Sequence, residues 1–164
     1  MHARMTVLKS PNESVDYIET VINDWWEAED SNLSDRYNID YYTEVNVEQG
    51  VDILKRNFGH SGCGFKYDKN TQEVTITLKG VVKYFYDMIR EINSFMQDNK
   101  PVDNFVSNLY SLQLAVQPEH PKILAGCCGL VDLVGFARSA YNKMMYEHVD
   151  KVVFKVYKCY DYHF

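Results

Sequence analysis

The order of apolar and polar residues predicts helices and strands over most of the chain. From Val15 onward, apolar residues recur every three or four positions and carboxylates fall between them, which is typical of an amphipathic helix with one buried face. The preceding sequence SPNE, Ser10 to Glu13, offers a capping serine, a proline suited to the first helical position and a glutamate for a capping box, so we expect the helix to begin there. The residues from Val47 to Phe58 predict a second helix, with Asn46 as its cap and Gly59 at its end.

Three stretches have the alternation or the composition of strands. Residues 37–45 alternate in polarity, which predicts one strand. Residues 64–78 form two alternating runs on either side of the turn sequence DKNT, and this pattern predicts a hairpin. Residues 151–164 are rich in β-branched and aromatic side chains, so we expect the chain to end in a strand.

Three further helices are expected in the second half of the chain. Apolar residues at helical spacing run from Val81 to Phe95 and stop before Pro101. A shorter helix is predicted over residues 104–116. The segment from Lys122 to His148 is predicted to be a mostly buried helix that would break at Gly126–Gly129.

Together these elements predict one α+β domain over residues 1–164, with a mostly antiparallel sheet covered by about five helices. At 46% apolar residues, the chain has enough material for one sizeable core. Its longest apolar run, Ile123 to Ala137, is shorter than the roughly 20 residues that a bilayer requires, and it contains Asp132. The N-terminus lacks the pattern of a secretory signal, so we expect a cytoplasmic protein with no membrane partner and with its four cysteines reduced.

Negative charge is concentrated in the first third of the chain. Residues 1–50 hold 11 Asp and Glu against 3 Lys and Arg, whereas the remaining residues are close to balance. Residues 10–35 contain eight carboxylates and neither Lys nor Arg, so this region would repel the phosphate backbone of a nucleic acid. We therefore expect no direct nucleic-acid binding, and an attraction to basic protein surfaces.

The same acidic region holds large aromatic residues, and we interpret it as an interaction surface. Trp26 falls near the edge of the apolar face of the first predicted helix, where an indole can be half exposed. The predicted surface combines steering charge with contact area and consists of Asp16, Asp24, Trp26, Glu27, Asp30, Tyr41 and Tyr42. The alternative is that the aromatic residues belong to the core and the carboxylates only keep the surface solvated.

A thiol nucleophile is the main catalytic alternative. In the sequence GHSGCGF, His60 and Cys63 are close together and glycines flank the thiol, although no third group is evident to orient the imidazole. Cys127 and Cys128 would lie near a helix N-terminus, which lowers the pKa of a thiol, but they occur in the most apolar segment. The chain has no C-x-x-C pair, no H-x-x-x-H and no glycine-rich phosphate loop, so we predict neither a metal nor a cofactor.

These observations favour a non-enzymatic protein-binding module over an enzyme. Its acidic surface would dock on a basic protein, such as a nucleic-acid-binding protein or a nuclease, by imitating the phosphates that this partner binds. An inhibitor or adaptor of the kind that phages and mobile elements use against host defence nucleases fits this pattern. Two alternatives stay open: a thiol-dependent enzyme that uses Cys63 and His60, and a structural subunit of a virion or another large assembly. The oligomeric state is not predicted.

Overall fold

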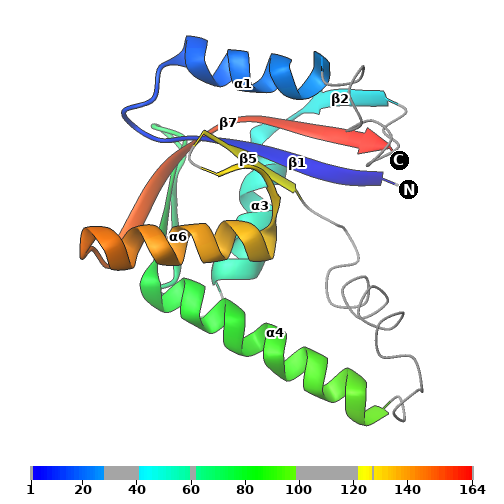
Figure 1. Cartoon of the computed structure of the whole chain (residues 1–164), viewed down its shortest axis with the longest axis vertical. Coiled ribbons are helices and arrows are strands. Elements are labelled where there is room, and N and C mark those ends of the chain that lie inside the picture. The colour runs from blue at the N-terminus through cyan, green and yellow to red at the C-terminus, as the bar shows by residue number, and fades with distance from the viewer. Residues whose placement is uncertain (1, 28–40, 60–61, 99–121, 127, 164) are drawn as a thin grey trace.

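The protein folds into a seven-stranded mixed sheet with helices on both of its faces (Figure 1). The computed structural model describes residues 2–27, 41–59, 62–98, 122–126 and 128–163. The strands are β1 (His2–Lys9), β2 (Tyr41–Val45), β3 (Phe65–Asp68), β4 (Glu73–Thr77), β5 (Lys122–Ala125), β6 (Gly129–Asp132) and β7 (Lys151–His163). The helices are α1 (Val15–Glu27), α3 (Val47–Phe58), α4 (Leu78–Asp98) and α6 (Leu133–Glu147).

The long strand β7 organises the sheet. The strand order is β3-β4-β7-β1-β5-β6, and β2 pairs with β7 as well. The first residues of β7 pair with β4 and its last residues pair with β2, while β1 runs antiparallel along its other side. Only β1 and β5 form a parallel pair among the described strands, so the sheet is mostly antiparallel.

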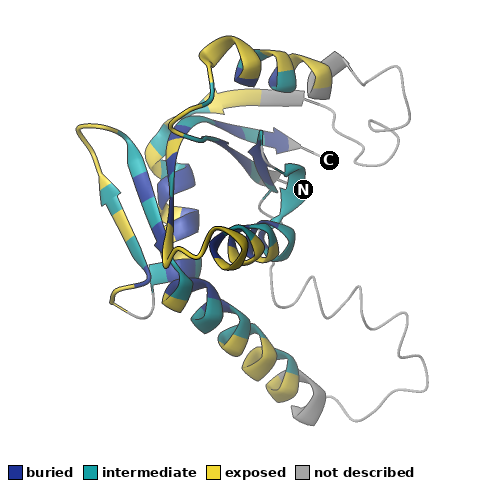
Figure 2. Cartoon of the chain, turned by 60° about the vertical axis from the view of Figure 1, so that its left-hand side comes forward, coloured by how far each residue is buried: buried dark blue, intermediate teal, exposed yellow. Residues whose placement is uncertain are grey.

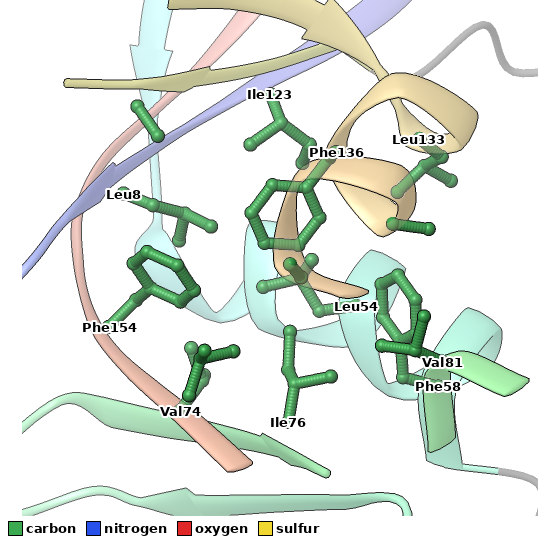
Figure 3. Close-up of a cluster of buried hydrophobic side chains, with 14 of the residues drawn as sticks. Leu8, Leu54, Phe58, Val74, Ile76, Val81, Ile123, Leu133, Phe136 and Phe154 are labelled. Carbon is green, nitrogen blue, oxygen red and sulfur yellow. The ribbon is translucent and has the colours of Figure 1, made fainter. Parts of the chain in front are cut away.

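The two faces of the sheet support two separate cores. Alternate strand residues point to opposite faces, so Leu124 of β5 packs towards α1 while its neighbours Ile123 and Ala125 pack towards α3 and α6. The α1 core is the smaller one and is built on Met5, Val7, Ile18, Ile22, Leu124, Tyr160 and Tyr162. The larger core lies on the other face under α3, α4 and α6, and Figure 3 shows its interlocked side chains. In Figure 2 the buried positions accordingly follow the strands and the inner sides of the helices.

Most of the predicted elements are confirmed. The α+β class and the mostly antiparallel sheet are as expected. Helix α3 spans Val47–Phe58 with the Asn46 side chain accepting from the Glu48 N–H (3.1 Å) and Gly59 as its C-cap. The hairpin is formed by β3 and β4, the C-terminal strand is β7, and the 81–95 stripe lies within α4. The predicted helix over 104–116 lies outside the described residues.

Two expectations about local structure are wrong. Helix α1 begins at Val15 rather than at the SPNE sequence, because the Ser14 hydroxyl accepts the Tyr17 N–H (3.1 Å) and acts as the cap. Ser10 and Glu13 instead close a turn before the helix: the Ser10 N–H donates to the Glu13 carboxylate (2.6 Å) and the Glu13 N–H donates to the Ser10 carbonyl (3.0 Å). The segment from Lys122 begins with the β5–β6 hairpin, and only Leu133–Glu147 is helical.

No helix within the described ranges is both long and apolar enough to cross a bilayer. Helix α4 has the length for it, at 21 residues, but it carries charged residues along its exposed side. The amphipathic pattern of α4 therefore fits a helix that packs on α3 and α6 along one side only.

Candidate interaction surface

Helix α1 is held on the sheet by two buried isoleucines. Ile18 and Ile22 are 1% and 2% exposed and pack on Met5 and Val7 of β1. Their four-residue spacing places both side chains on one side of the helix, with Val21 partly buried beside them and Thr20 exposed on the opposite side. This anchoring determines which part of α1 is available to a partner.

The outward face of α1 combines carboxylates with partly apolar residues. Asp16 and Asp24 are exposed, as are the polar residues Thr20 and Asn23. Val15 and Tyr17 are each 48% exposed at the N-terminal end of the same helix. We call the exposed residues Val15, Asp16, Tyr17, Thr20, Asn23 and Asp24 the α1 surface.

Tyr17 is a half-exposed aromatic residue of this surface that the sequence interpretation did not single out. Its hydroxyl lies 3.5 Å from the Gly126 carbonyl oxygen, in the β5–β6 turn. A side-chain carbon on Gly126 would come within 2.8 Å of the Tyr17 ring, so the absence of a side chain there leaves room for the tyrosine. The Tyr17 ring therefore packs against the β5–β6 turn, while about half of the residue stays exposed. Its position directly after Asp16, in the first turn of the helix, was the available signal.

One carboxylate of α1 is not part of this surface, because strand β7 neutralises it. Glu19 Oε1 accepts a hydrogen bond from the Tyr157 hydroxyl (2.5 Å) and pairs with Lys158 Nζ (2.8 Å). Consecutive residues of a regular strand point to opposite faces, but the β1–β7 register shifts beside Val7 and Leu8 and leaves Tyr157 without an opposite residue. This bulge lets both side chains reach α1. The hydrogen bonds from Lys158 and Tyr157 hold the pKa of Glu19 below its ordinary value of 4.5.

Glu19→Gln is expected to lower the free energy of unfolding by up to about 1 kcal/mol near pH 7, the range for a partly exposed ion pair. A carboxyl group with a lowered folded-state pKa stabilises the protein above pH 4.5, and this contribution disappears as the pH falls through the folded-state value. Urea unfolding of both proteins at pH 7 and at pH 3 measures the effect. The two proteins should differ at pH 7, and the difference should shrink as the pH is lowered below 4.5 to pH 3. Glu91→Gln, on the exposed side of α4, is the matched control and should change neither value; a Glu19→Gln difference that persists unchanged at pH 3 would contradict the ion-pair explanation.

The other residues of the predicted surface lie at the ends of α1 and in β2. Trp26 and Glu27 belong to the last turn of α1, and their side chains lie outside what the structure describes. Asp30 is outside the described residues altogether. Tyr41 and Tyr42 are the first two residues of β2, where they pair with His163 and Tyr162 of β7.

Strand β2 offers an outer edge next to this helix. Among the described strands it pairs only with β7, and Thr43 and Glu44 are exposed. Figure 1 places β2 beneath the C-terminal half of α1. Of the predicted surface, Asp24 and strand β2 therefore lie at the C-terminal end of α1, whereas Asp16 lies in its first turn, at the other end of the helix.

The thiols are spread over three separate environments. Cys63 is exposed just before β3, and its carbonyl oxygen accepts from the Thr77 hydroxyl (3.1 Å); its predicted partner His60 lies outside the described residues. Cys128 is half-buried in the β5–β6 turn and not at a helix N-terminus, which corrects the expected dipole effect on its pKa; Cys127 is not described. Burial raises the pKa of the Cys159 thiol, so this cysteine is a poor nucleophile.

Within the ranges that the structure describes, no three His, Cys, Asp or Glu side chains come close enough together to hold a metal ion. Comparisons of the chain with known family models, with curated proteins and with solved structures found no match. The functional conclusion therefore depends on the geometry and charge of this chain alone.

Proposed function

We propose that the protein is a non-enzymatic binding module that docks on a basic protein through the α1 surface and the neighbouring edge of β2. The observation that carries the proposal is the uncompensated negative charge of α1. Asp16 and Asp24 are exposed on the same helix, and no ion pair joins either of them to another residue in the described part of the chain.

The charge arrangement at the end of α1 is unfavourable for the isolated helix. A helix C-terminus carries a partial negative charge, so basic residues stabilise the last turn and acidic residues destabilise it by about 0.3–1 kcal/mol each. The last turn of α1 contains no basic residue, while Asp24 and Glu27 lie at this end. Residues that lower the stability of their own helix are expected where they serve a function. A basic partner would supply the missing positive charge.

The composition of the surface also fits protein binding better than simple solvation. Interfaces concentrate their energy in aromatic anchors surrounded by polar and charged residues, and the half-exposed Tyr17 directly follows the exposed Asp16. Trp26, Tyr41 and Tyr42 are proposed to add contact area where α1 ends and β2 begins. The exposed edge of β2 can in addition accept backbone hydrogen bonds from an extended segment of the partner.

The partner is proposed to be a protein with a basic, phosphate-binding surface. Clustered carboxylates raise the association rate with such a surface and can occupy positions that nucleic-acid phosphates would take. The protein would then act as an inhibitor of a nuclease or of another nucleic-acid-binding protein, or as an adaptor that recruits it. This role is consistent with the phage or mobile-element setting inferred from the charge pattern.

The test is to capture partners from the source cell and then to measure the affinity of the purified partner. Asp16→Lys combined with Asp24→Lys reverses the charge of the α1 surface, and we expect the dissociation constant to rise at least tenfold at 0.05 M salt. Raising the salt to 0.5 M should weaken wild-type binding strongly and the variant's binding much less, since the screening length falls from roughly 14 Å to about 4 Å. Trp26→Ala should lower the affinity independently of salt.

The matched control is Glu91→Lys combined with Glu147→Lys, which makes the same change in net charge on α4 and α6. The control should bind like the wild type. If the α1 variant and the control bind alike, or if affinity is indifferent to both salt and Trp26→Ala, the proposed surface is wrong.

A further inference from the structure

A pocket of about 680 Å³ lies along the exposed side of α3, away from the α1 surface. Helix α3 contributes Gln49, Asp52, Lys55 and Arg56 to its wall, β1 contributes Arg4, and β3 contributes Phe65. Helix α3 and strand β3 are neighbours in sequence, whereas Arg4 comes from the distant strand β1, so only the fold brings this arginine to the pocket. The sequence interpretation did not identify this site.

The pocket is positively charged in an acidic protein. Three cations, Arg4, Lys55 and Arg56, face one carboxylate, Asp52, whereas the whole chain carries a net charge of −6. Arginine presents a planar fork of donors that matches phosphate oxygens, and lysine adds a point charge. The Arg56 Nε lies 3.4 Å from the Asp52 carbonyl oxygen one turn earlier, so the guanidinium lies back along the helix. This charge pattern is suited to a phosphorylated ligand.

The pocket is elongated along α3, so it suits an elongated ligand. The lining residues of α3 extend from Gln49 to Gly59, which corresponds to about 15 Å along the helix axis. Arg4 lies near the first half of α3, since it is two residues from Thr6, whose side chain packs against Gly50. The cations are therefore distributed along the pocket, as a chain of phosphates would require.

The opposite end of the pocket is lined by Gly59, Gly62 and Phe65. A side-chain carbon on Gly59 would lie 3.9 Å from the Phe65 Cβ, so the glycine borders Phe65 directly. Gly62 also lines this end; it has a positive φ of 67°, and a side-chain carbon there would meet no atom within 4 Å. The half-buried Phe65 is packed against the larger core along one side, so its position is fixed. An aromatic ring that lines a pocket in a fixed position is a surface on which a planar base can stack.

We propose that this pocket binds a nucleoside polyphosphate, with the base on Phe65 and the phosphates along Lys55, Arg56 and Arg4. Gln49 provides an amide for hydrogen bonds to the terminal phosphate. This site is independent of the proposed docking function, because it uses other residues on another face.

Isothermal titration calorimetry with ATP, adenosine and tripolyphosphate tests the assignment at low salt. We expect ATP to bind more tightly than tripolyphosphate, and adenosine to bind least. Lys55→Gln combined with Arg56→Gln should weaken ATP binding at least tenfold, and Arg4→Gln should weaken it as well. Phe65→Leu should weaken ATP binding while leaving tripolyphosphate binding unchanged, which a merely destabilised protein would not do.

Lys66→Gln combined with Lys69→Gln is the matched control, because both lysines are exposed on the neighbouring hairpin and the change in net charge is the same. It should bind ATP like the wild type. The proposal is overturned if ATP produces no binding heat at millimolar concentration, if the control loses as much affinity as the pocket variant, or if tripolyphosphate binds as tightly as ATP. Asp16→Lys with Asp24→Lys should leave ATP binding intact, so failure of one proposal is distinguishable from failure of the other.

Discussion

Phe136→Ala is expected to lower the free energy of unfolding by about 3–5 kcal/mol, the usual cost of removing a buried aromatic ring. Phe136 of α6 is 1% exposed. Its ring centroid lies 6.1 Å from that of Phe58 in α3 and 5.5 Å from that of Phe154 in β7 (Figure 3). One side chain therefore connects two helices and the central strand. Because a domain of this size has a total stability of about 5–15 kcal/mol, the substitution removes a large part of it.

Urea unfolding followed by circular dichroism measures this loss. Tyr146→Ala is the matched control, since Tyr146 lies ten residues further along the same helix and is 88% exposed. Truncating an exposed ring should change the stability by no more than about 0.5 kcal/mol. Similar losses in the two variants would show that the α6 contact is not part of the cooperative core.

The sequence predicts elements best where the determining interactions are local. Helix α3 has its cap, its apolar stripe and its C-terminal glycine within 14 consecutive residues, and its bounds are as predicted. Strand β1 was not predicted, because Met5, Thr6, Val7 and Leu8 are all fully buried and a strand buried on both faces has no alternation. Its partners in β5 and β7 lie more than 100 residues away, so no local pattern identifies it.

The segment that begins at Lys122 was assigned to a helix for a related reason. A short apolar run such as β5 fits a buried strand as well as a buried helix, because periodicity does not separate them over four residues. The turn is marked by Gly129, which has a positive φ of 67°, a conformation that favours glycine. A glycine pair around adjacent cysteines was therefore a hairpin signal.

The two proposed sites also differ in how far local sequence predicts them. Helical periodicity alone places Asp16 and Asp24 outside, and both are exposed in the structure. Phe65 follows α3 after a short connection, but the α3 pocket also depends on Arg4, which reaches this helix only because β1 is paired into the sheet. Long-range pairing of this kind is beyond a single sequence.

The start of α4 has no room for a side chain at its third residue, Gly80. Thr77 caps the helix: its hydroxyl accepts the Gly80 N–H (3.1 Å) and donates to the Cys63 carbonyl (3.1 Å), while its N–H donates to the Gly64 carbonyl (3.0 Å). These bonds hold the first turn of α4 against the chain that leads into β3. A side-chain carbon on Gly80 would lie 2.5–2.9 Å from the carbonyl oxygen, Cα and carbonyl carbon of Gly64.

Gly80→Ala is therefore expected to destabilise the protein by about 1–3 kcal/mol, although alanine is intrinsically the better helix former by up to about 1 kcal/mol. Gly50→Ala in α3 is the informative comparison, because the obstructing atoms there are the Oγ1 and Cγ2 of Thr6, at 2.7 and 2.8 Å. Thr6→Ala removes both atoms, so the double variant should recover part of the stability lost in Gly50→Ala. The atoms that obstruct Gly80 belong to the backbone of Gly64, so no side-chain substitution can relieve that clash. Urea midpoints of the four variants measure this difference; Gly80→Ala as stable as the wild type would mean that the first turn of α4 can separate from Gly64 at little cost.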